Sequence, residues 1–230
     1  MEKIVILTGA GISAESGLGT FRDEGGLWAQ HRIDDVATPE GFTRNPQLVH
    51  DFYNARRAQA VEAQPNPAHE ALARLQREAK GEVVIVTQNV DGLHEAAGAS
   101  GVLHMHGALE GALCATCDHR WPAPLAMAPD DQCPSCRSST TRPDIVWFGE
   151  MPYFMDDIWQ HLEEADVFAA IGTSGQVYPA AAFGQHAGRA GAHTIELNLE
   201  PSVNSRDFTE ARHGPASELV PLWVEQELSR

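Results

Sequence analysis

Residues 3–17 read KIVILTGAGISAESG, a short apolar run followed by glycines. A run of this length without alternation is typical of a strand that is buried on both faces of a parallel sheet. Gly9, Gly11 and Ala14 satisfy the pattern G-x-G-x-x-A, which brings backbone amides up to a diphosphate when it follows a strand. The acid that ends a second strand about 20 residues later in an ordinary dinucleotide-binding unit is missing. The segment favours phosphate binding but leaves a plain glycine-rich turn as the alternative.

Similar apolar runs recur along the chain, and helical patterns lie between several of them. The runs are EVVIVTQN (82–89), DIVWFGE (144–150), DVFAAIGTS (166–174) and HTIELNLE (193–200). The helical patterns cover 46–64, 67–79, 157–165, 179–190 and 216–228. Strands interleaved with helices predict an α/β fold with a doubly wound parallel sheet. Ligands of such sheets bind at the carboxyl ends of the strands, so the polar residues there are the first candidates.

Composition limits the classes of function. With 43% apolar and 21% charged residues, the chain of 230 residues is ordinary globular material with room for a sizeable core. The formal net charge of −16 argues against direct nucleic-acid binding, which needs basic surface. The apolar run Ile4–Leu7 is too short for a signal peptide or a membrane span. We therefore expect no membrane partner and a cytoplasmic location.

Residues 107–142 interrupt the α/β pattern and contain all four cysteines. The cysteines follow the spacing C-x2-C-x15-C-x2-C, at Cys114, Cys117, Cys133 and Cys136. Two such pairs predict a tetrahedral zinc site with four thiolates, which leaves no open position on the metal and is structural. Two disulfides or a redox pair are the alternatives, and they are less favoured in a chain without a signal peptide.

Two further strand ends carry polar residues. Gly172, Thr173 and Ser174 follow one apolar run, and Asn198 and Glu200 end another. Singly, these residues are as well explained by helix caps or solvated loops. Together with the first glycine loop they predict one nucleotide crevice, in which a carboxylate accepts hydrogen bonds from ribose hydroxyls.

The segment TQNVDGLH places Gln88, Asn89 and Asp91 at a strand-to-helix junction, where Asn and Asp are most often caps. His104 and His106 are two residues apart and share one side if the chain is extended. Spacing alone does not choose a catalytic histidine between them.

The helix predicted over 46–64 carries a tyrosine and two arginines. Tyr53 and Arg56 are neighbours at the edge of its buried face, and Arg57 is expected to turn further outward. By spacing alone, an arginine at the helix margin that reaches into solvent is the preferred interpretation.

At this point the sequence resembles a known family. GAGISAESG, TFRD, TQNVDGLH, HMHG, the two cysteine pairs, VWFGEMP, GTSGQVYP and LNLEP occur in the order found in sirtuins, the NAD-dependent protein lysine deacylases. The resemblance runs from about residue 4 to residue 222. One departure is Gly19, where many relatives carry a larger residue or proline; it is expected to loosen the loop without changing the chemistry.

The resemblance implies one catalytic unit over residues 1–230, with NAD and an acyl-lysine peptide bound between two domains. The Rossmann-like large domain is expected at about 1–27, 80–106 and 143–230. Insertions at about 28–79, which is helical, and 107–142, the zinc module, are expected to form the small domain. The implied cofactors are NAD and one structural zinc ion, and the implied partners are proteins with acylated lysines.

The resemblance also implies roles for single residues. His106 matches the catalytic base, which acts toward the ribose hydroxyls, whereas His104 matches no catalytic position. The positions that match cofactor contacts are Gly9, Ala10, Gly11, Ile12, Ser13, Glu15, Phe21, Arg22, Trp28, Gln88, Asn89, Asp91, Gly172, Thr173, Ser174, Asn198, Leu199, Glu200 and Ala216. Among them, Gln88 and Asn89 are implied to contact the nicotinamide ribose, and Asp91 the nicotinamide carboxamide.

The substrate peptide is implied to add as a strand between residues 148–150 and 175–178, with contacts from Phe148, Gly149, Glu150 and Val177. Tyr53 and Arg56 resemble the pair with which one class of sirtuins binds the distal carboxylate of succinyl and malonyl groups. The resemblance therefore implies desuccinylation, with malonyl and acetyl groups as further substrates. The products are free lysine, nicotinamide and 2′-O-acyl-ADP-ribose.

Other functions remain open on the sequence. A plain deacetylase and an NAD-dependent mono-ADP-ribosyltransferase would use the same cofactor site. A binding protein for NAD or ADP-ribose without catalysis would not need the base at His106. A dehydrogenase is the least favoured, because the acid on the second strand is missing and the zinc site is closed.

Overall fold

The computed structural model describes residues 2–19 and 31–230. Its main sheet has six parallel strands in the order β3-β2-β1-β7-β8-β9. The strands are β1 (Lys3–Thr8), β2 (Glu82–Thr87), β3 (Leu103–His104), β7 (Val167–Ile171), β8 (His193–Asn198) and β9 (Glu210–His213). The predicted α/β fold with a parallel sheet is confirmed.

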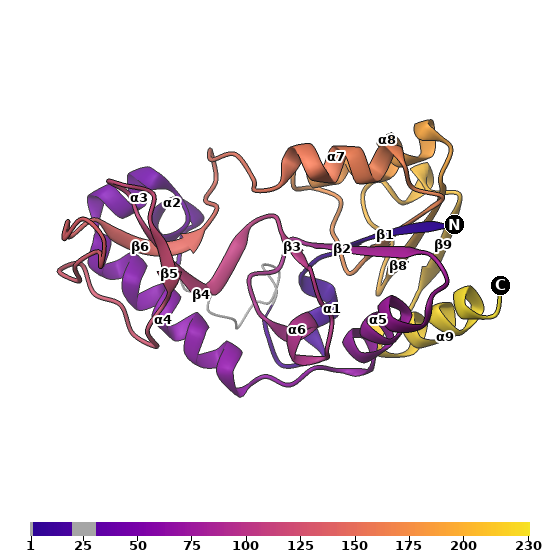
Figure 1. The fold of residues 1–230 in the computed structure, drawn as a ribbon, viewed down its shortest axis with the longest axis horizontal. Coiled ribbons are helices and arrows are strands. Elements are labelled where there is room, and N and C mark those ends of the chain that lie inside the picture. Colours follow the sequence, from indigo (N-terminus) through magenta and orange to yellow (C-terminus); the bar gives the residue numbers. More distant parts are fainter. Residues whose placement is uncertain (1, 20–30) are drawn as a thin grey trace.

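Helices cover both faces of this sheet (Figure 1). The helices α5 (Pro67–Glu78) and α9 (Ala216–Leu228) lie on one face, and α7 (Met155–Glu163) and α8 (Phe183–Ala190) on the other. Because successive side chains of a strand point to opposite faces, β1 contributes Ile4 and Ile6 to one core and Val5 and Leu7 to the other. This two-sided burial explains why the run is apolar without alternation.

Short helices and 3₁₀ turns follow the carboxyl ends of several strands and connect them to the longer elements. They are α1 (Ala10–Ala14), α6 (Leu93–Ala96), and the 3₁₀ turns Ala180–Ala182 and Ser205–Asp207. The first helix ends at Ala14, and Gly17 follows with a φ of 85°. Such a φ favours glycine because other residues meet a steric clash there.

Local signals define where the longer helices begin. The Asn66 side chain accepts a hydrogen bond from the backbone N–H of Ala68, and His69 completes a capping box at the start of α5. The helices α3 (Pro39–Arg44) and α4 (Pro46–Glu62) begin in the same manner, after Thr38 and Asn45. A proline follows each of the three caps, where its missing N–H costs nothing.

A second, antiparallel sheet lies at the end of the molecule away from both termini (Figure 1). It has the order β5-β4-β6 and contains β4 (Gly107–Cys114), β5 (Arg120–Pro122) and β6 (Thr141–Ile145). The helices α2 (Ile33–Val36), α3 and α4 lie beside it in the ribbon. The predicted division of the chain into two domains at the ranges given above stays a prediction.

The segment DIVWFGE does not belong to the parallel sheet, and this expectation was wrong. The strand β6 ends at Ile145 and pairs antiparallel with β4. A turn follows, in which the backbone N–H of Glu150 donates to the carbonyl of Trp147 at 3.0 Å. The apolar side chains of Ile145 and Trp147 fill a third core with α4, so the segment is apolar for a different reason.

Among the described residues, no helix is long and apolar enough to span a membrane.

Candidate active site at the carboxyl ends of the strands

Two glycine loops meet where β1 and β7 end. The N–H of Gly9 donates to the carbonyl of Ile171, and the N–H of Gly11 donates to that of Gly172, both at 2.9 Å. A Cβ on Gly9 would lie 2.8 Å from the Gly172 oxygen, and a Cβ on Gly172, whose φ is 65°, would lie 2.4 Å from the backbone nitrogen of Ile12. Only glycine allows this approach of two backbones.

The meeting point is the place where an open α/β sheet binds its ligand. From β1 the chain proceeds to β2 on one side, whereas β7 and β8 extend the sheet on the other side. The crevice beyond the carboxyl ends of β1 and β7 is therefore a topological switch point. Gly9, Gly11 and Gly172 meet at this point, which confirms that these separate sequence motifs lie together.

The loop after β8 continues the crevice. The side-chain amide of Asn198 donates to the carbonyl of Thr173 at 2.8 Å and so ties the ends of β8 and β7 together. Leu199 and Glu200 are exposed beyond it. Thr173, Asn198, Leu199 and Glu200 are among the positions that match cofactor contacts in the family, and this role stays a prediction.

The start of α9 lies on the same side of the sheet as α1. Glu15 accepts hydrogen bonds from the backbone N–H of Ser217, at 3.0 Å, and from its hydroxyl. Ala216, the first residue of α9, is buried. The structure therefore gives Glu15 a bond to a helix start, and its predicted cofactor contact stays a prediction.

The segment after β2 is connected to the glycine loop by side chains. The Asn89 amide donates to the Gly9 carbonyl at 3.1 Å and to the Ser13 hydroxyl at 3.0 Å. The Ser13 hydroxyl donates to Asp91 at 3.1 Å, and Asp91 also accepts from the backbone N–H of Leu93 at 3.2 Å. Asp91 thus holds the first residue of α6 and is bonded to the glycine loop as well, and its contact with the cofactor stays a prediction. Burial raises the pKa of its carboxyl group, and the two hydrogen bonds oppose this.

His106 and His104 both bond to the segment after β2. The Nδ1 of His106 lies 3.1 Å from the Gln88 carbonyl; because a carbonyl only accepts, Nδ1 carries the proton and Nε2 keeps its lone pair. Burial lowers the pKa of His106 and outweighs the carbonyl, which raises it. The residue that the resemblance assigns as the base is therefore neutral at neutral pH, with Nε2 able to accept a proton.

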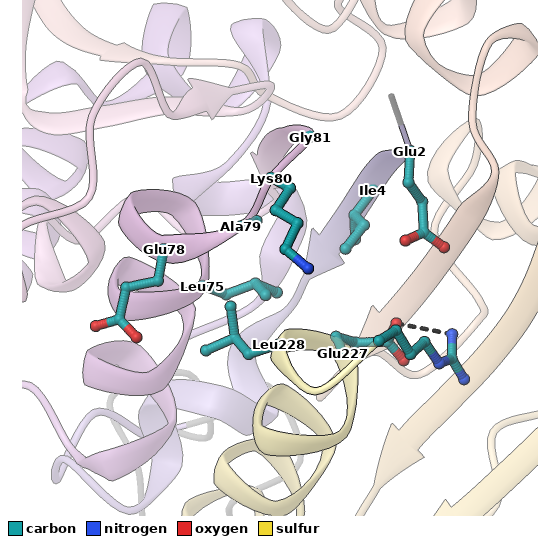
Figure 2. Close-up of a pocket in the computed structure, with 10 residues that line it drawn as sticks. Glu2, Ile4, Leu75, Glu78, Ala79, Lys80, Gly81, Glu227 and Leu228 are labelled. Carbon is teal, nitrogen blue, oxygen red and sulfur yellow. Dashed lines mark hydrogen bonds and ion pairs between the residues drawn. The ribbon is translucent and has the colours of Figure 1, made fainter.

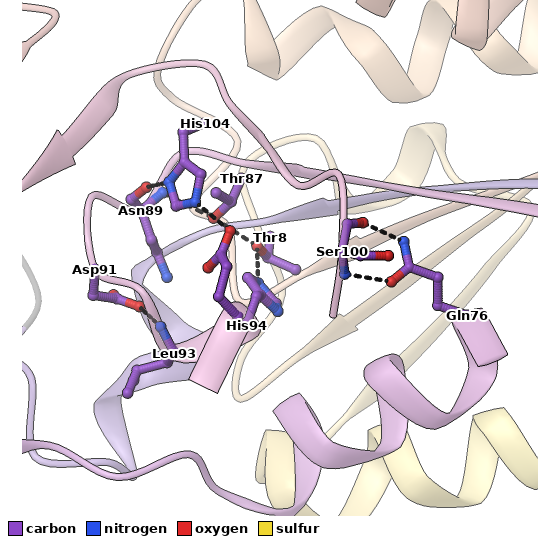
Figure 3. Close-up of polar contacts among 10 residues, drawn as sticks. Thr8, Gln76, Thr87, Asn89, Asp91, Leu93, His94, Ser100 and His104 are labelled. Carbon is purple, nitrogen blue, oxygen red and sulfur yellow. Dashed lines mark hydrogen bonds and ion pairs between the residues drawn. The ribbon is translucent and has the colours of Figure 1, made fainter. Parts of the chain in front are cut away.

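His104 is bonded on both ring nitrogens. Its Nδ1 lies 3.2 Å from the Asn89 carbonyl and its Nε2 lies 2.9 Å from a Glu95 oxygen (Figure 3). Burial acts to lower the pKa of His104, but the bond and charge of Glu95 raise it overall. A histidine that donates from both nitrogens cannot serve as a base, which agrees with the absence of a catalytic match at this position.

Behind the site lies a chain of buried polar groups that sequence patterns did not reveal. His94 donates to the Thr8 hydroxyl at 2.9 Å, and Thr8 donates to the Thr87 hydroxyl at 2.8 Å (Figure 3). Thr87 also accepts the backbone N–H of Asn89 at 3.0 Å. Burial lowers the pKa of His94 to about 3 and that of the neighbouring His69 to about 4. Both histidines are therefore neutral. His94 supports the segment that carries Asn89 through Thr8 and Thr87, and His69 packs against the His94 ring.

Tyr53 and Arg56 project from the same face of α4. Tyr53 is buried, and burial raises the pKa of its phenol to about 12. Burial also lowers the pKa of the partly buried Arg56, while the nearby groups of Tyr53 and Asp91 raise it. Tyr53 and Arg56 are three residues apart on α4, and Val90 of the segment after β2 packs in the same core as Tyr53. The predicted neighbourhood of the pair is confirmed, and its role in binding substrate stays a prediction.

Arg57 does not turn outward, and this expectation was wrong. It is 3% exposed, and its guanidinium donates to the Leu109 carbonyl at 2.7 Å and to the Asn54 side chain at 2.9 Å. A third bond, at 3.3 Å, reaches the carbonyl of Leu125. The reason is that β4 and the loop 125–127 both pack against α4 and bury a second face of the helix. The spacing of apolar residues had predicted that this face is exposed to solvent.

The four cysteine side chains converge in space. All four sulfur atoms lie within 4.8 Å of one another, with 3.6 Å between Cys114 and Cys136 and 3.8 Å between Cys117 and Cys133. A zinc ion with Zn–S bonds of about 2.3 Å in tetrahedral geometry separates its sulfurs by about 3.8 Å. The cysteines are therefore positioned to bind a structural zinc ion, and the donor set leaves no coordination position for a substrate.

The residues predicted for peptide binding lie at the surface. Phe148 is 47% exposed, Gly149 is exposed with a φ of 91°, and Val177 is partly buried. Glu150 instead accepts two bonds from the Arg142 guanidinium, at 2.6 and 2.9 Å. The side chain of Glu150 therefore organises its own loop, and the pairing of this loop with a peptide stays a prediction. Phe21, Arg22 and Trp28 lie outside the described residues.

A small cavity of about 110 Å³ lies far from these groups. It is bounded by Glu2 and Ile4 at the start of β1 and by the carboxyl ends of α5 and α9, with Lys80 and Glu227 at its rim (Figure 2). This is the opposite edge of the sheet from the carboxyl ends of the strands. We assign it no part in the site.

Comparisons with known proteins agree with this geometry. Residues 9–179 match the Sir2 family. An NAD-dependent protein deacylase of Caulobacter vibrioides is 53% identical over 99% of this chain and 98% of its own length. An NAD-dependent protein deacylase of Escherichia coli strain K12 is 53% identical over 98% of this chain and 83% of its own length.

Solved structures of the family superimpose closely. A Sir2 homolog–NAD complex gives a TM-score of 0.91 with 37% identity and covers 99% of this chain and 90% of its own. The structure of Sir2Af2 bound to a myristoylated histone peptide gives 0.76 with 32% identity, and covers 100% and 92%. The matched family model, the relatives at 53% identity and the agreement of the folds show that the chain belongs to the Sir2 family.

Proposed function

We propose that this protein is an NAD-dependent protein-lysine deacylase that removes succinyl groups and also accepts malonyl and acetyl groups. The curated relatives at 53% identity are named NAD-dependent protein deacylases, which supports the general activity. The preference among acyl groups goes beyond those names and rests on Tyr53 and Arg56.

The crevice between β1 and β7 suits the diphosphate of NAD. The glycines there carry no side chains and their backbones approach closely, and the G-x-G-x-x-A pattern after β1 is typical of a diphosphate site. Thr173, Asn198 and Glu200 line its continuation, where the adenosine end would bind. When bound, NAD supplies a ribose that accepts the acyl group and a nicotinamide that leaves.

The single observation that carries the catalytic assignment is the bond between His106 and Gln88. Because Nδ1 donates to the Gln88 carbonyl, Nε2 is the atom that accepts a proton, and the bond also fixes the orientation of the ring. Asn89 follows Gln88 directly and Asp91 comes two residues later, and both are tied to the glycine loop through Ser13. The base and the predicted nicotinamide contacts are thus parts of one connected segment.

The acyl preference is supported by the surroundings of Arg56. A guanidinium has a planar set of donors that matches a carboxylate, and the Tyr53 phenol beside it is a second donor. Val90, next to Asp91, packs in the same core as Tyr53, and the charge of Asp91 raises the pKa of Arg56, so the pair faces the predicted nicotinamide end of the cofactor site. An acyl chain with a terminal carboxylate would have its reacting carbonyl near the cofactor and its charge at this pair.

Protein substrates with acylated lysine are the proposed partners. One solved relative, Sir2Af2, is bound to a myristoylated histone peptide, which supports a substrate of this kind. The net charge of −16 would favour encounter with basic segments around a target lysine. A cytoplasmic location and the absence of nucleic-acid binding stay predictions.

The test is a steady-state comparison of one peptide that carries succinyl-lysine, malonyl-lysine or acetyl-lysine, with and without NAD. We expect NAD-dependent release of nicotinamide and formation of 2′-O-acyl-ADP-ribose with all three peptides, and the highest kcat/KM for the succinyl peptide. Removal of acetyl alone would make the protein a plain deacetylase. A mass of ADP-ribose added to a target protein, with the acyl group retained, would make it an ADP-ribosyltransferase.

A further inference from the structure

Trp147 contacts the hydroxyl that the proposed function assigns to acyl recognition. Its indole Nε1–H donates to the Tyr53 hydroxyl oxygen at 3.0 Å. The two side chains are 2% and 1% exposed and come from segments 94 residues apart in the sequence. A hydrogen bond at this depth is not exchanged with water, so it fixes the geometry of both partners.

The Trp147 ring is held in place independently of Tyr53. The Arg142 guanidinium lies 3.5 Å from the centroid of the indole, and it also donates to both carboxylate oxygens of Glu150. The backbone N–H of Trp147 donates to Glu150 at 2.8 Å. Phe42 packs against the same indole with a centroid distance of 5.3 Å. These contacts set the direction in which the indole N–H points.

The direction of this bond determines what the Tyr53 hydroxyl can do. A phenol has one proton and can accept as well as donate. Because the indole has only a donor, the Tyr53 oxygen accepts and its own proton points elsewhere. Within residues 2–19 and 31–230, no further group hydrogen-bonds to this hydroxyl. With its pKa raised to about 12 by burial, the phenol keeps that proton at neutral pH.

We propose that Trp147 is a positioning residue for acyl selection: its indole N–H holds the Tyr53 hydroxyl as an acceptor, so that the hydroxyl donates its proton to the distal carboxylate of a succinyl or malonyl group. This inference rests on the proposed function. An acetyl group has no such carboxylate, so the bond between Trp147 and Tyr53 contributes nothing to its recognition. Trp147 therefore acts on specificity through Tyr53 without touching the reacting atoms.

The test replaces the indole by a ring without the N–H. Trp147→Phe keeps an aromatic face beside Arg142 and leaves the Tyr53 hydroxyl without its donor. We expect kcat/KM for the succinyl peptide to fall by about two- to tenfold, as for the loss of one neutral hydrogen bond, mainly through KM. The kcat/KM for the acetyl peptide should change by less than about twofold.

Two further variants separate positioning from simple packing. Trp223→Phe removes an equally buried indole from the core between α9 and the main sheet, and should leave the ratio of the two activities unchanged. Tyr53→Phe removes the hydroxyl itself. In that background, Trp147→Phe should cause no further selective loss, because the group that it positions is gone.

Three outcomes overturn the inference: equal losses on both peptides, no loss on the succinyl peptide, or the same selective loss in the Tyr53→Phe background. If the wild type removes no succinyl group, the proposed preference and this inference fall together. If the wild type desuccinylates, and Tyr53→Phe weakens that activity selectively while Trp147→Phe does not, only the inference falls.

A second substitution keeps the test decisive if Trp147→Phe does not fold. Site-specific incorporation of 3-benzothienylalanine at position 147 retains the shape of the indole and replaces its N–H by sulfur. The contact with Arg142 is then preserved and only the donor to Tyr53 is lost. The same selective loss on the succinyl peptide is expected, and an unchanged ratio of activities would refute the role of the N–H.

Discussion

The Nδ1 of His106 lies 3.1 Å from the backbone carbonyl of Gln88. This bond selects one tautomer of a neutral imidazole and leaves Nε2 as the only basic atom of the side chain. Gln88 comes directly before Asn89, so the residue that orients the proposed base also begins the segment expected at the nicotinamide ribose. A shift of this backbone would therefore affect the base and the cofactor contact together.

The pH dependence of kcat/KM should reflect the lowered pKa of His106. The protonated imidazolium cannot act as a base, so activity is lost as pH falls through this pKa. Since burial lowers the pKa from its ordinary value of about 6.5, the acidic limb of the profile is expected below pH 6.5. A pH series on the wild type, with His104→Gln as control, tests this. An acidic limb that lies above pH 7, or that disappears in the control variant, would contradict the assignment.

Arg56→Ala should reduce desuccinylation selectively. A hydrogen bond to a charged group is worth about 1.5–3 kcal/mol, so kcat/KM for the succinyl peptide should fall by about ten- to a hundredfold. The acetyl peptide has no carboxylate and should change far less. Parallel assays of both peptides with wild type and variant decide the matter, and equal losses on both would refute the carboxylate clamp.

Arg57→Ala should show the opposite pattern, although the two arginines are adjacent in the sequence. The substitution leaves the Leu109 carbonyl without its donor and removes the bonds that join α4 to the loop 125–127. We expect a loss of about 1–3 kcal/mol in the free energy of unfolding and a Tm lower by about 3–10 °C. The ratio of desuccinylation to deacetylation should be unchanged. A selective loss of desuccinylation at unaltered Tm would show instead that Arg57 binds the acyl carboxylate and would contradict the structural role given to it here.

Removal of one cysteine thiolate should cost stability and zinc. Cys133→Ser is expected to retain less than one zinc ion per chain, and its Tm should fall because the metal's binding energy contributes to folding. Ser138→Ala removes a partly buried hydroxyl near the same cluster without removing a thiolate, and serves as the matched control. Metal analysis and thermal unfolding of both variants test the site. Full zinc content in Cys133→Ser would argue against four-thiolate ligation.

The buried His94 predicts a loss of stability in acid. Its pKa is lowered to about 3 in the folded state and is about 6.5 when unfolded, so the unfolded chain binds more protons between these values. Its contribution is fully present above pH 6.5 and declines as pH falls toward 3. As the pH falls from 7.5 to 5.5, protonation of this histidine in the unfolded chain should lower the free energy of unfolding by about 1 kcal/mol.

Urea unfolding of wild type and His94→Gln at both pH values measures this effect. The variant lacks the titrating group and should be less stable at pH 7.5, because the bond to Thr8 is altered. Its stability should nevertheless fall about 1 kcal/mol less between the two pH values. An identical pH dependence of both proteins would show that His94 does not titrate in this manner.

The pattern of apolar residues was sufficient to predict most strands of the main sheet, because these strands are buried on both faces. The apolar runs around Ile6, Ile85, Phe168 and Ile195 predicted strands correctly, and the helical pattern over 67–79 corresponds to α5. The strand β9 was missed because its residues Glu210–His213 lie at the edge of the sheet and alternate in exposure without an apolar signal.

The errors arose where two elements cover one segment. Trp147 and its neighbours are as apolar as a parallel strand, but they pack against α4 in a different core. Arg57 was expected in solvent because helix periodicity contains no information on the loop that covers it. Neither contact is visible in the spacing of residues, since both depend on chain segments more than 50 positions away.

The roles of single side chains required the family resemblance and then the geometry. Spacing did not distinguish His104 from His106. The structure does, because His104 donates from both nitrogens and His106 from only one. Trp147 was quoted within a motif, but its contact with Tyr53 could not be inferred from sequence distance.

The contact between the two glycine loops limits how the crevice can be redesigned. A methyl group on Gly9 would clash with the backbone of Gly172, and one on Gly172 would clash with that of Ile12. Because both clashes are with backbone atoms, no substitution at one position can make room for a side chain at the other. Leu199 and Glu200, which are exposed beyond β8, carry no such restriction. An effort to alter cofactor preference, for instance toward a phosphorylated nucleotide, should therefore keep the glycines and randomise the loop after β8.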